Sequence, residues 1–247
     1  MFHVKHEVDI GVTTQAEVIR GAAGIGVGLS PDQARIIARH LALVLEANEH
    51  VNLTAIREPS EALRLHVCDS LLALPELSES PEGSCVDLGS GAGFPGIPLA
   101  VVSGRSFVLC ESVNRKARFL EAAVVDLGLQ EHVTVVSRRA EDLSVSNREG
   151  FAVVVARAVA PLSALVELAS PLLAQGGRLL AFKSRSADEV DAADRTALLV
   201  GMRHRSTREV LLPEGGERRT IIVYEREGAS SITLPRRTGM AQKRPVA

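Results

Sequence analysis

The 247-residue sequence contains no tryptophan, a single tyrosine and only three cysteines. Because there is no tryptophan and only Tyr224 as a tyrosine, a stacking platform of the RRM or OB type is not expected. Cys68, Cys85 and Cys110 have no C-x-x-C spacing, which argues against a structural zinc site or a disulfide framework. No hydrophobic run approaches the length of a membrane span, and the charged start at residues 1–9 is unlike a signal peptide. These absences predict a globular cytoplasmic protein without a metal site or a membrane partner.

Charge is unevenly distributed along the chain. The formal net charge is −2, yet residues 201–247 hold ten Lys and Arg against five Asp and Glu, which leaves −7 on the first 200 residues. A local basic surface is therefore compatible with a slightly acidic whole. A hydrophobic content of 46% and a charged content of 23% are ordinary for a globular protein, and the length suffices for one large domain with an extension.

The most informative stretch runs from Cys85 to Val102, CVDLGSGAGFPGIPLAVV. It begins as a short apolar strand, passes into a glycine-rich turn and continues as a helix from about Pro95. Glycine tolerates positive φ and leaves no Cβ between the backbone and a ligand. Pro95 suits the first turn of a helix, where an amide hydrogen has no partner within the helix. The pattern predicts the strand, loop and helix of a Rossmann-like nucleotide site.

Two carboxylates indicate which nucleotide this site takes. The run from Gly91 to Gly96 matches G-x-G-x-x-G, which alone is a weak signal. Asp87, two residues before Gly89, is poorly placed for a pyrophosphate but suits the cationic amino-acid part of S-adenosylmethionine (SAM). Glu111 ends the next expected strand, where a carboxylate can accept both ribose hydroxyls; the alternative is a cap on the following helix. The loop resembles that of class I SAM-dependent methyltransferases, while an NAD-dependent oxidoreductase stays the less favoured reading.

Hydrophobic periodicity predicts helices before this loop and alternating strands and helices after it. Residues 1–29 show no clear pattern and are expected to be flexible. Residues 30–80 are expected to form a helical extension, residues 81–229 the SAM-binding domain, and residues 230–247 a disordered basic tail. The expected strands cover 85–88, 106–111, 133–136, 151–155 and 178–182, followed by a hairpin at 209–212 and 220–225. The expected helices cover 31–47, 59–74, 115–127, 161–173 and 188–200. This order predicts an α/β sandwich with a mainly parallel sheet.

Further candidate residues stand where other strands end. Ala140 and Glu141 follow the third strand, where backbone could meet an adenine edge, although Glu141 is equally well explained as a helix cap. Arg157 ends the very apolar fourth strand and needs a carboxylate, phosphate or aromatic partner. A ligand contact and a structural ion pair explain Arg157 equally well. His66 and Asp69 lie three residues apart on one expected helix face, and a structural role is favoured for both.

Five motifs occur in one order along the chain: Asn52-Leu53-Thr54-Ala55, Arg64-x-His66-x-x-Asp69-Ser70, the loop from Asp87 to Leu99, Arg115-Lys116-x-x-Phe119-Leu120, and Ala156-Arg157-Ala158. Together they closely resemble the bacterial 16S ribosomal RNA guanine-N7 methyltransferase family, also called glucose-inhibited division protein B. The resemblance covers about residues 30–225, and its Gly-Phe-Pro-Gly-Ile-Pro segment is specific. The sequence departs from the family at Lys183-Ser184, where a Lys-Gly pair is expected.

The resemblance implies a fold, a cofactor and a reaction. It implies a Rossmann-like methyltransferase that methylates N7 of a guanine in 16S ribosomal RNA, with SAM as cofactor and the RNA or the small subunit as partner. It also implies SAM contacts at Gly89, Phe94, Ala140, Glu141 and Arg157, in addition to Asp87, Gly91 and Glu111. Arg157 is the candidate for positioning, and no catalytic base is assigned because N7 carries a free lone pair.

Motifs of other methylation chemistries are missing. The fourth strand is followed by Arg157-Ala158-Val159-Ala160 instead of the N/D-P-P-Y/F run of adenine amino-group enzymes, and there is no Pro-Cys nucleophile. RNA phosphates would meet cationic side chains that flank the strand ends. The candidates are Arg115, Lys116, Arg118, Arg139 and Lys183. A monomer is expected, and a non-catalytic RNA-binding regulator that keeps this fold stays open as the alternative.

Overall fold

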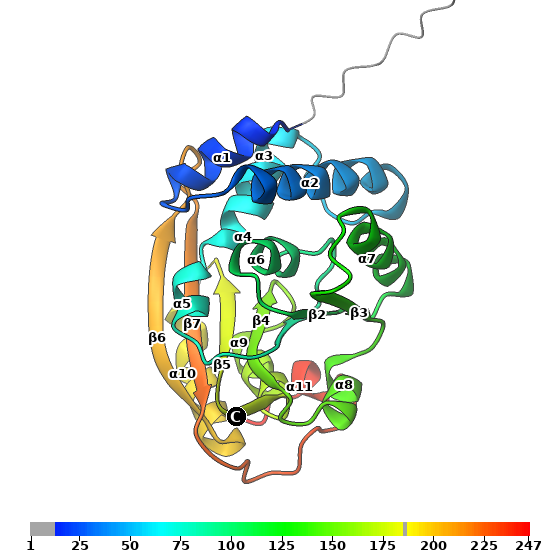
Figure 1. The fold of residues 1–247 in the computed structure, drawn as a ribbon. Coiled ribbons are helices and arrows are strands. Elements are labelled where there is room, and N and C mark those ends of the chain that lie inside the picture. The colour runs from blue at the N-terminus through cyan, green and yellow to red at the C-terminus, as the bar shows by residue number, and fades with distance from the viewer. Residues whose placement is uncertain (1–12, 185–186) are drawn as a thin grey trace, which may run out of the picture.

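The computed structural model describes residues 13–184 and 187–247. One seven-stranded sheet with the order β3-β2-β1-β4-β5-β7-β6 forms the centre, and helices cover it on both faces (Figure 1). Strands β1 to β5 are parallel, whereas β7 runs antiparallel to both of its neighbours, β5 and β6. The strands are β1 (Cys85–Leu88), β2 (Phe107–Cys110), β3 (Val133–Val136), β4 (Phe151–Arg157), β5 (Leu173–Lys183), β6 (Met202–Leu211) and β7 (Arg218–Arg226).

Sequence dictates which strands lie at the centre of the sheet. The run Phe151–Ala156 is continuously apolar and buried, as a parallel strand covered on both faces must be. In β1 the alternation splits the two faces: Val86 and Leu88 pack with the helices α9 and α10, whereas Cys85 packs with α6 and α7. Asp87 shares the Cys85 face and therefore points toward α6.

Of the five helices of the sandwich, the first, second and last agree closely with expectation, the third was not expected, and the fourth ends at Ala169 instead of 173 because β5 already begins at Leu173. They are α6 (Gly96–Ser103), α7 (Asn114–Asp126), α8 (Ala140–Ser146), α9 (Leu162–Ala169) and α10 (Ala187–Val200). The expected Rossmann-like α/β sandwich with an N-terminal helical extension is confirmed. The hairpin β6–β7 is longer than expected because β6 pairs with β7 along its whole length, from Met202 opposite Arg226 to Leu211 opposite Arg218. In the described part of the chain no helix has the length and apolarity that crossing a membrane requires.

An N-terminal layer of helices caps the end of the sheet at which the parallel strands terminate (Figure 1). It comprises α1 (Gln15–Gly24), α2 (Pro31–Val51), α3 (Pro59–Ala62), the π-helical turn η1 (Leu63–Cys68), α4 (Asp69–Leu71) and α5 (Leu74–Ser78). The expected flexibility of residues 1–29 is wrong over α1. Thr14 and Glu17 form a reciprocal capping box there, and Val18 and Ala22 are buried. Residues 1–12 lie outside the described part.

The C-terminal segment also differs from expectation. Residues 230–247 were expected to be a disordered tail, but they pack along α8 and α9 and include the short helix α11 (Met240–Lys243). Leu234 and Ala241 are buried, and Arg236 forms a bidentate ion pair with Glu167. The basic composition of the segment suggested disorder. Its few apolar residues and the ion pair of Arg236 with the buried carboxylate of Glu167 are nevertheless enough to fix it on the domain.

Candidate functional site

The glycine loop after β1 is shaped by positive backbone angles. Gly89, Gly91 and Gly93 have φ of 70°, 59° and 94°, a region that side chains with a Cβ rarely adopt. The Gly89 amide continues the ladder by donating to Cys110 O at 2.8 Å, so the loop leaves the sheet only after β2 has ended. A Cβ at Gly91 would come within 4 Å of only one atom, Gly89 O, at 3.8 Å. The backbone at Gly91 is therefore open to a ligand.

Asp87 and Gly96 join the strand to the helix that follows the loop. The Gly96 amide donates to Asp87 Oδ2 at 2.9 Å, and a Cβ at Gly96 would lie 2.7 Å from that oxygen. Asp87 is fully buried, burial raises its pKa to about 7, and Oδ1 has no hydrogen-bond partner. The carboxylate thus holds the start of α6 in this structure, a local capping role that is compatible with the expected contact to the cationic end of SAM.

Glu111 lies against the same loop from the neighbouring strand. Its Oε2 accepts from the Gly91 amide at 3.0 Å, and its Oε1 accepts from the Val113 amide at 2.7 Å, just before α7. The side chain thereby caps the next helix, which was the alternative role, and it also reaches the loop, while the contact to the ribose hydroxyls stays a prediction. Each carboxylate oxygen retains a lone pair for a ribose hydroxyl.

Phe94 is buried between two histidines instead of facing the open side of the loop. Its ring stacks on His66, with centroids 4.9 Å apart, and lies 4.5 Å from the His40 ring. His40 Nε2 donates to Ala92 O at 2.8 Å, and burial lowers the pKa of His40 to about 4. The side chain of Phe94 therefore attaches the loop to the N-terminal layer, and the SAM contact expected at this position stays a prediction.

Arg157 finds its partner in Asp69. Their contact is 2.9 Å long, and Arg219 of β7 binds the other oxygen of Asp69 at the same distance. Arg157 also donates to His66 Nδ1 at 3.3 Å, and burial together with the Arg157 charge lowers the pKa of His66 to about 3. His66 Nε2 in turn donates to Thr54 Oγ1 at 2.8 Å. Of the two roles considered for Arg157, a ligand contact and a structural ion pair, the structure shows the ion pair.

Ala140 and Glu141 begin α8, next to the end of β3. Glu141 Oε1 accepts from the Gly239 amide of the C-terminal segment at 2.6 Å. Ala140 packs on the hydrophobic cluster below the sheet. Glu141 is thus engaged by a segment that was expected to be disordered.

The five candidate RNA contacts separate into two groups. Arg115, Lys116 and Arg118 lie near the start of α7 and Arg139 directly precedes α8; Arg115, Arg118 and Arg139 are exposed and Lys116 is half-buried. Lys183 differs from the expected free phosphate contact, because its ammonium binds Ala160 O and Glu189 at 2.8 Å and its side chain is 12% exposed. Lys183 lies at the buried end of β5, where the carboxylate of Glu189 is close enough to neutralise its charge.

The loop and its neighbours fit a nucleoside cofactor. Gly91 offers an open amide backbone, and Glu111 presents a carboxylate to the same loop, which are the two elements that hold an adenosine moiety in this fold. SAM, when bound, supplies an electrophilic methyl group on its sulfonium. In the described residues no group of His, Cys, Asp and Glu is arranged to hold a metal ion.

Sequence reasoning missed two parts of this site. His40 of α2 touches the loop from 52 residues away along the chain, and no local motif announces it. Asp69 was noticed through its spacing from His66, but its role as the shared partner of Arg157 and Arg219 depends on contacts 88 and 150 residues apart. Only tertiary structure brings such partners together.

Solved structures confirm the fold. Geranyl diphosphate C-methyltransferase from Streptomyces coelicolor, solved with S-adenosyl-L-homocysteine, has a TM-score of 0.54 at 14% identity, covering 68% of this chain and 80% of that one. A geranyl diphosphate methyltransferase solved with sinefungin has a TM-score of 0.55 at 15% identity, covering 80% of this chain and all of that one.

Sequence relatives are much closer. A ribosomal RNA small subunit methyltransferase G from Symbiobacterium thermophilum is 38% identical over 234 residues, which are 92% of this chain and 95% of the relative. The protein of the same name from Deinococcus radiodurans is 38% identical over 92% of this chain and 90% of its own length. The family model for rRNA small subunit methyltransferase G, GidB, matches residues 33–220. The chain therefore belongs to the rRNA small subunit methyltransferase G family.

Proposed function

We propose that this protein transfers the methyl group of SAM to N7 of a guanine in 16S ribosomal RNA. The observation that carries the proposal is the open glycine loop with Glu111 beside it, in a chain whose relatives are methyltransferases of small-subunit ribosomal RNA. We expect the enzyme to work in the cytoplasm as a monomer, on either the free RNA or the subunit.

The chain's own residues bind and align the reactants in this proposal. The backbone at Gly89 and Gly91 and the carboxylate of Glu111 hold the nucleoside of SAM, and Asp87 keeps the helix start in place. Guanine N7 has a lone pair at neutral pH, so methyl transfer requires no proton removal, and alignment supplies most of the rate enhancement. The residues around the loop agree with this scheme, because His40 and His66 are neutral and hydrogen-bonded within the protein.

Arg157 acts as a positioning residue in this scheme. Its guanidinium binds Asp69 and lies 5.7 Å from the Phe94 ring centroid, so it connects the end of β4, the N-terminal layer and the glycine loop. We expect Arg157→Ala to lower turnover without introducing a new dependence of the rate on pH.

The deciding experiment combines incorporation with chemical mapping. Tritium from labelled SAM should enter 16S ribosomal RNA, and borohydride reduction followed by aniline should cleave the product at the modified guanine. The rate at saturating substrates should be nearly flat across neutral pH, whereas a side-chain base would make it fall as that base is protonated. Methyl incorporation without aniline cleavage would move the target atom away from N7, and no incorporation at all would refute the proposed reaction.

A further inference from the structure

We propose that the C-terminal segment, residues 229–247, is part of the RNA-binding surface. Together with the start of α7 and the loop before α8 it forms one cationic strip, which takes the phosphate backbone of the substrate RNA. This inference rests on the proposed function, since it names the part of the surface along which that RNA lies.

The segment is anchored in a way that leaves several of its cationic side chains free. Arg236 binds Glu167, whose side chain is 3% exposed, and the Gly239 amide binds Glu141. Arg148 adds a 3.0 Å contact to Leu234 O. These contacts fix the backbone on both sides of Arg237, and buried Leu234 and Ala241 complete the attachment.

The remaining cations of the segment point outward. Arg237, Lys243 and Arg244 are exposed, and within residues 13–184 and 187–247 no carboxylate pairs with any of them. Arg236, one residue earlier, is instead paired with Glu167. Arg236 therefore anchors the segment, whereas Arg237 faces solvent and is not paired with a carboxylate of the described residues.

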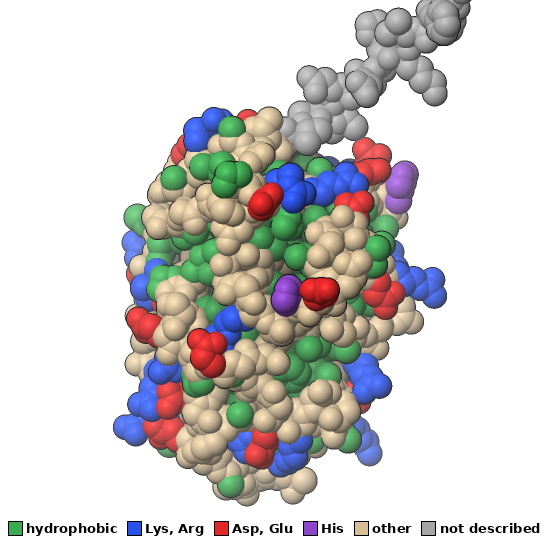
Figure 2. Space-filling view, in the orientation of Figure 1, with side chains coloured by type: hydrophobic (Ala, Val, Ile, Leu, Met, Phe, Trp, Pro, Cys, Tyr) green, Lys and Arg blue, Asp and Glu red, His purple; other side chains and the backbone are tan. Residues whose placement is uncertain are grey.

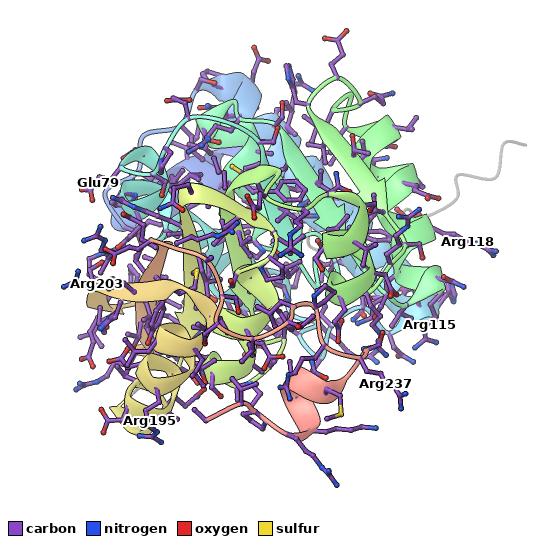
Figure 3. All side chains as sticks on the ribbon, turned by 90° about the horizontal axis from the view of Figure 1, so that it is seen from below. Glu79, Arg115, Arg118, Arg195, Arg203 and Arg237 are labelled. Atoms are coloured by element: carbon purple, nitrogen blue, oxygen red, sulfur yellow. The ribbon has the colours of Figure 1, made fainter. Side chains whose placement is uncertain are left out.

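Hydrogen bonds link this segment to α8, and the loop before α8 to the start of α7. Arg139 directly precedes α8, and Glu141 of the same helix holds Gly239. Ser137, just before that loop, donates to Asn114 Oδ1 at 2.8 Å and so connects it to the first residue of α7. Figure 3 shows Arg115, Arg118 and Arg237 projecting along one side of the molecule. Lys and Arg side chains also recur along the margin beside α7 and α8 in Figure 2.

Many cations in the β6–β7 hairpin, by contrast, are neutralised by carboxylates. In the β6–β7 hairpin Arg205 pairs with Glu225, Arg208 with Glu76, and Arg218 with Glu209. The exposed acids of α7 and α8 are Glu121, Asp126 and Asp142; Asp126 pairs with Arg39, and none of the three is ion-paired with a cation of the strip. The cations of the strip are therefore available to an external polyanion.

The strip begins at the cofactor loop. Glu111 contacts Gly91 with one oxygen and Val113, the residue before α7, with the other. An RNA strand held by Arg115, Arg139 and Arg237 would therefore pass the loop at one end and the C-terminal segment at the other. Phosphate contacts of this kind fix the register of a nucleic acid without reading its sequence.

Salt dependence of RNA binding tests the strip. The test variant is Arg237→Ala with Lys243→Ala. The matched control is Arg20→Ala with Arg195→Ala, which removes the same charge at two exposed arginines of α1 and α10 that likewise have no ion pair among the described residues. Figure 3 shows Arg195 on the side opposite to Arg237. The affinity of each protein for transcribed 16S ribosomal RNA is measured over a salt series. We expect the slope of log K against log salt to fall by roughly 1.4 to 1.8 in the test variant and to change much less in the control.

Two readouts separate the possible failures. Calorimetry should give the same SAM affinity for wild type and both variants, and Arg237→Glu should weaken RNA binding further without touching the anchor. A wild-type slope in a test variant that still methylates RNA would overturn the strip alone. An equal decrease of the salt slope in the test and control variants would also overturn the strip, because the effect would then depend only on the net charge of the protein. A wild-type protein that neither binds nor methylates 16S ribosomal RNA would refute the proposed function itself.

Discussion

Gly91 is the residue at which the cofactor hypothesis can be tested with least disturbance. Its φ of 59° makes a side chain cost about 1 kcal/mol, but its Cβ direction is open. Gly91→Ala should therefore fold and should lower the affinity for SAM at least about tenfold, or roughly 1.4 kcal/mol, by calorimetry. Gly128→Ala is the matched control, because Gly128 has φ of 68° with nothing within 4 Å. Unchanged SAM affinity in folded Gly91→Ala would place the cofactor elsewhere.

Asp69 is the residue on which two arginines depend. Its side chain is 5% exposed, and Asp69→Asn leaves Arg157 and Arg219 without their counterion. Removing one partner of such a buried pair costs about 3 kcal/mol or more, and turnover should fall because Arg157 loses its position. Urea unfolding and methyl transfer measure the two effects. Glu217→Gln, which removes the partner of Arg64 at a more exposed site, should cost less than about 1 kcal/mol. Equal costs at both sites would contradict the assignment.

At the scale of elements, α2 and the glycine loop pack so closely that they leave no room for a Cβ atom at Gly93. A Cβ at Gly93 would lie 2.6 Å from Ile97 Cδ1 and 2.9 Å from His40 Nε2. Gly93→Ala should therefore destabilise the protein by about 1 to 3 kcal/mol in urea unfolding, as overpacked sites do. Gly104→Ala, with φ of 69° and open space around it, shares the backbone strain without the clash. The same loss in both variants would show that strain alone is responsible.

Local patterns were enough for most elements and failed where partners are distant. Strand β3 and the first residue of α2 agree with the sequence reading because hydrophobic periodicity and the Ser30-Pro31 start are local signals. The reading missed α11 and the fixed C-terminal segment, since Arg236 finds Glu167 and Gly239 finds Glu141 only in the folded chain. The capping box at Thr14 and Glu17 was a usable local signal for α1. The glycine loop and Glu111 were predictable for the same reason, whereas the burial of Phe94 between histidines was not.

At the scale of the whole molecule, two buried groups give opposite dependences of stability on pH. The pKa of His40 is about 4 when folded and near 6.5 when unfolded, so between these values the unfolded chain binds one more proton. Its contribution to the free energy of unfolding is present above pH 6.5 and is lost toward pH 4, at about 1.4 kcal/mol per pH unit. Asp87, with a pKa raised to about 7, contributes stability below about pH 4 that is lost as the pH rises through 7.

Variants separate these two contributions. His40→Gln should flatten the fall in the free energy of unfolding between pH 6.5 and pH 4.5, whereas Asp87→Asn should steepen it, as measured by urea unfolding at several pH values. Asn at position 87 keeps an oxygen for the Gly96 amide. Parallel curves for wild type and His40→Gln would mean that His40 is protonated in the folded protein.

The glycine loop is held from two directions, by Glu111 of the sheet on one side and by His40 of α2 on the other. A ligand that binds only the ordered loop must then stabilise both neighbours together, by RT ln(1 + [L]/Kd) for every opening that breaks the loop. Hydrogen exchange would record this as slower exchange of the α2 amides when SAM is added, although no atom of α2 need touch the ligand. The stability of the N-terminal layer would thus depend on whether SAM is bound, and so would the affinity of any partner that binds only the ordered layer.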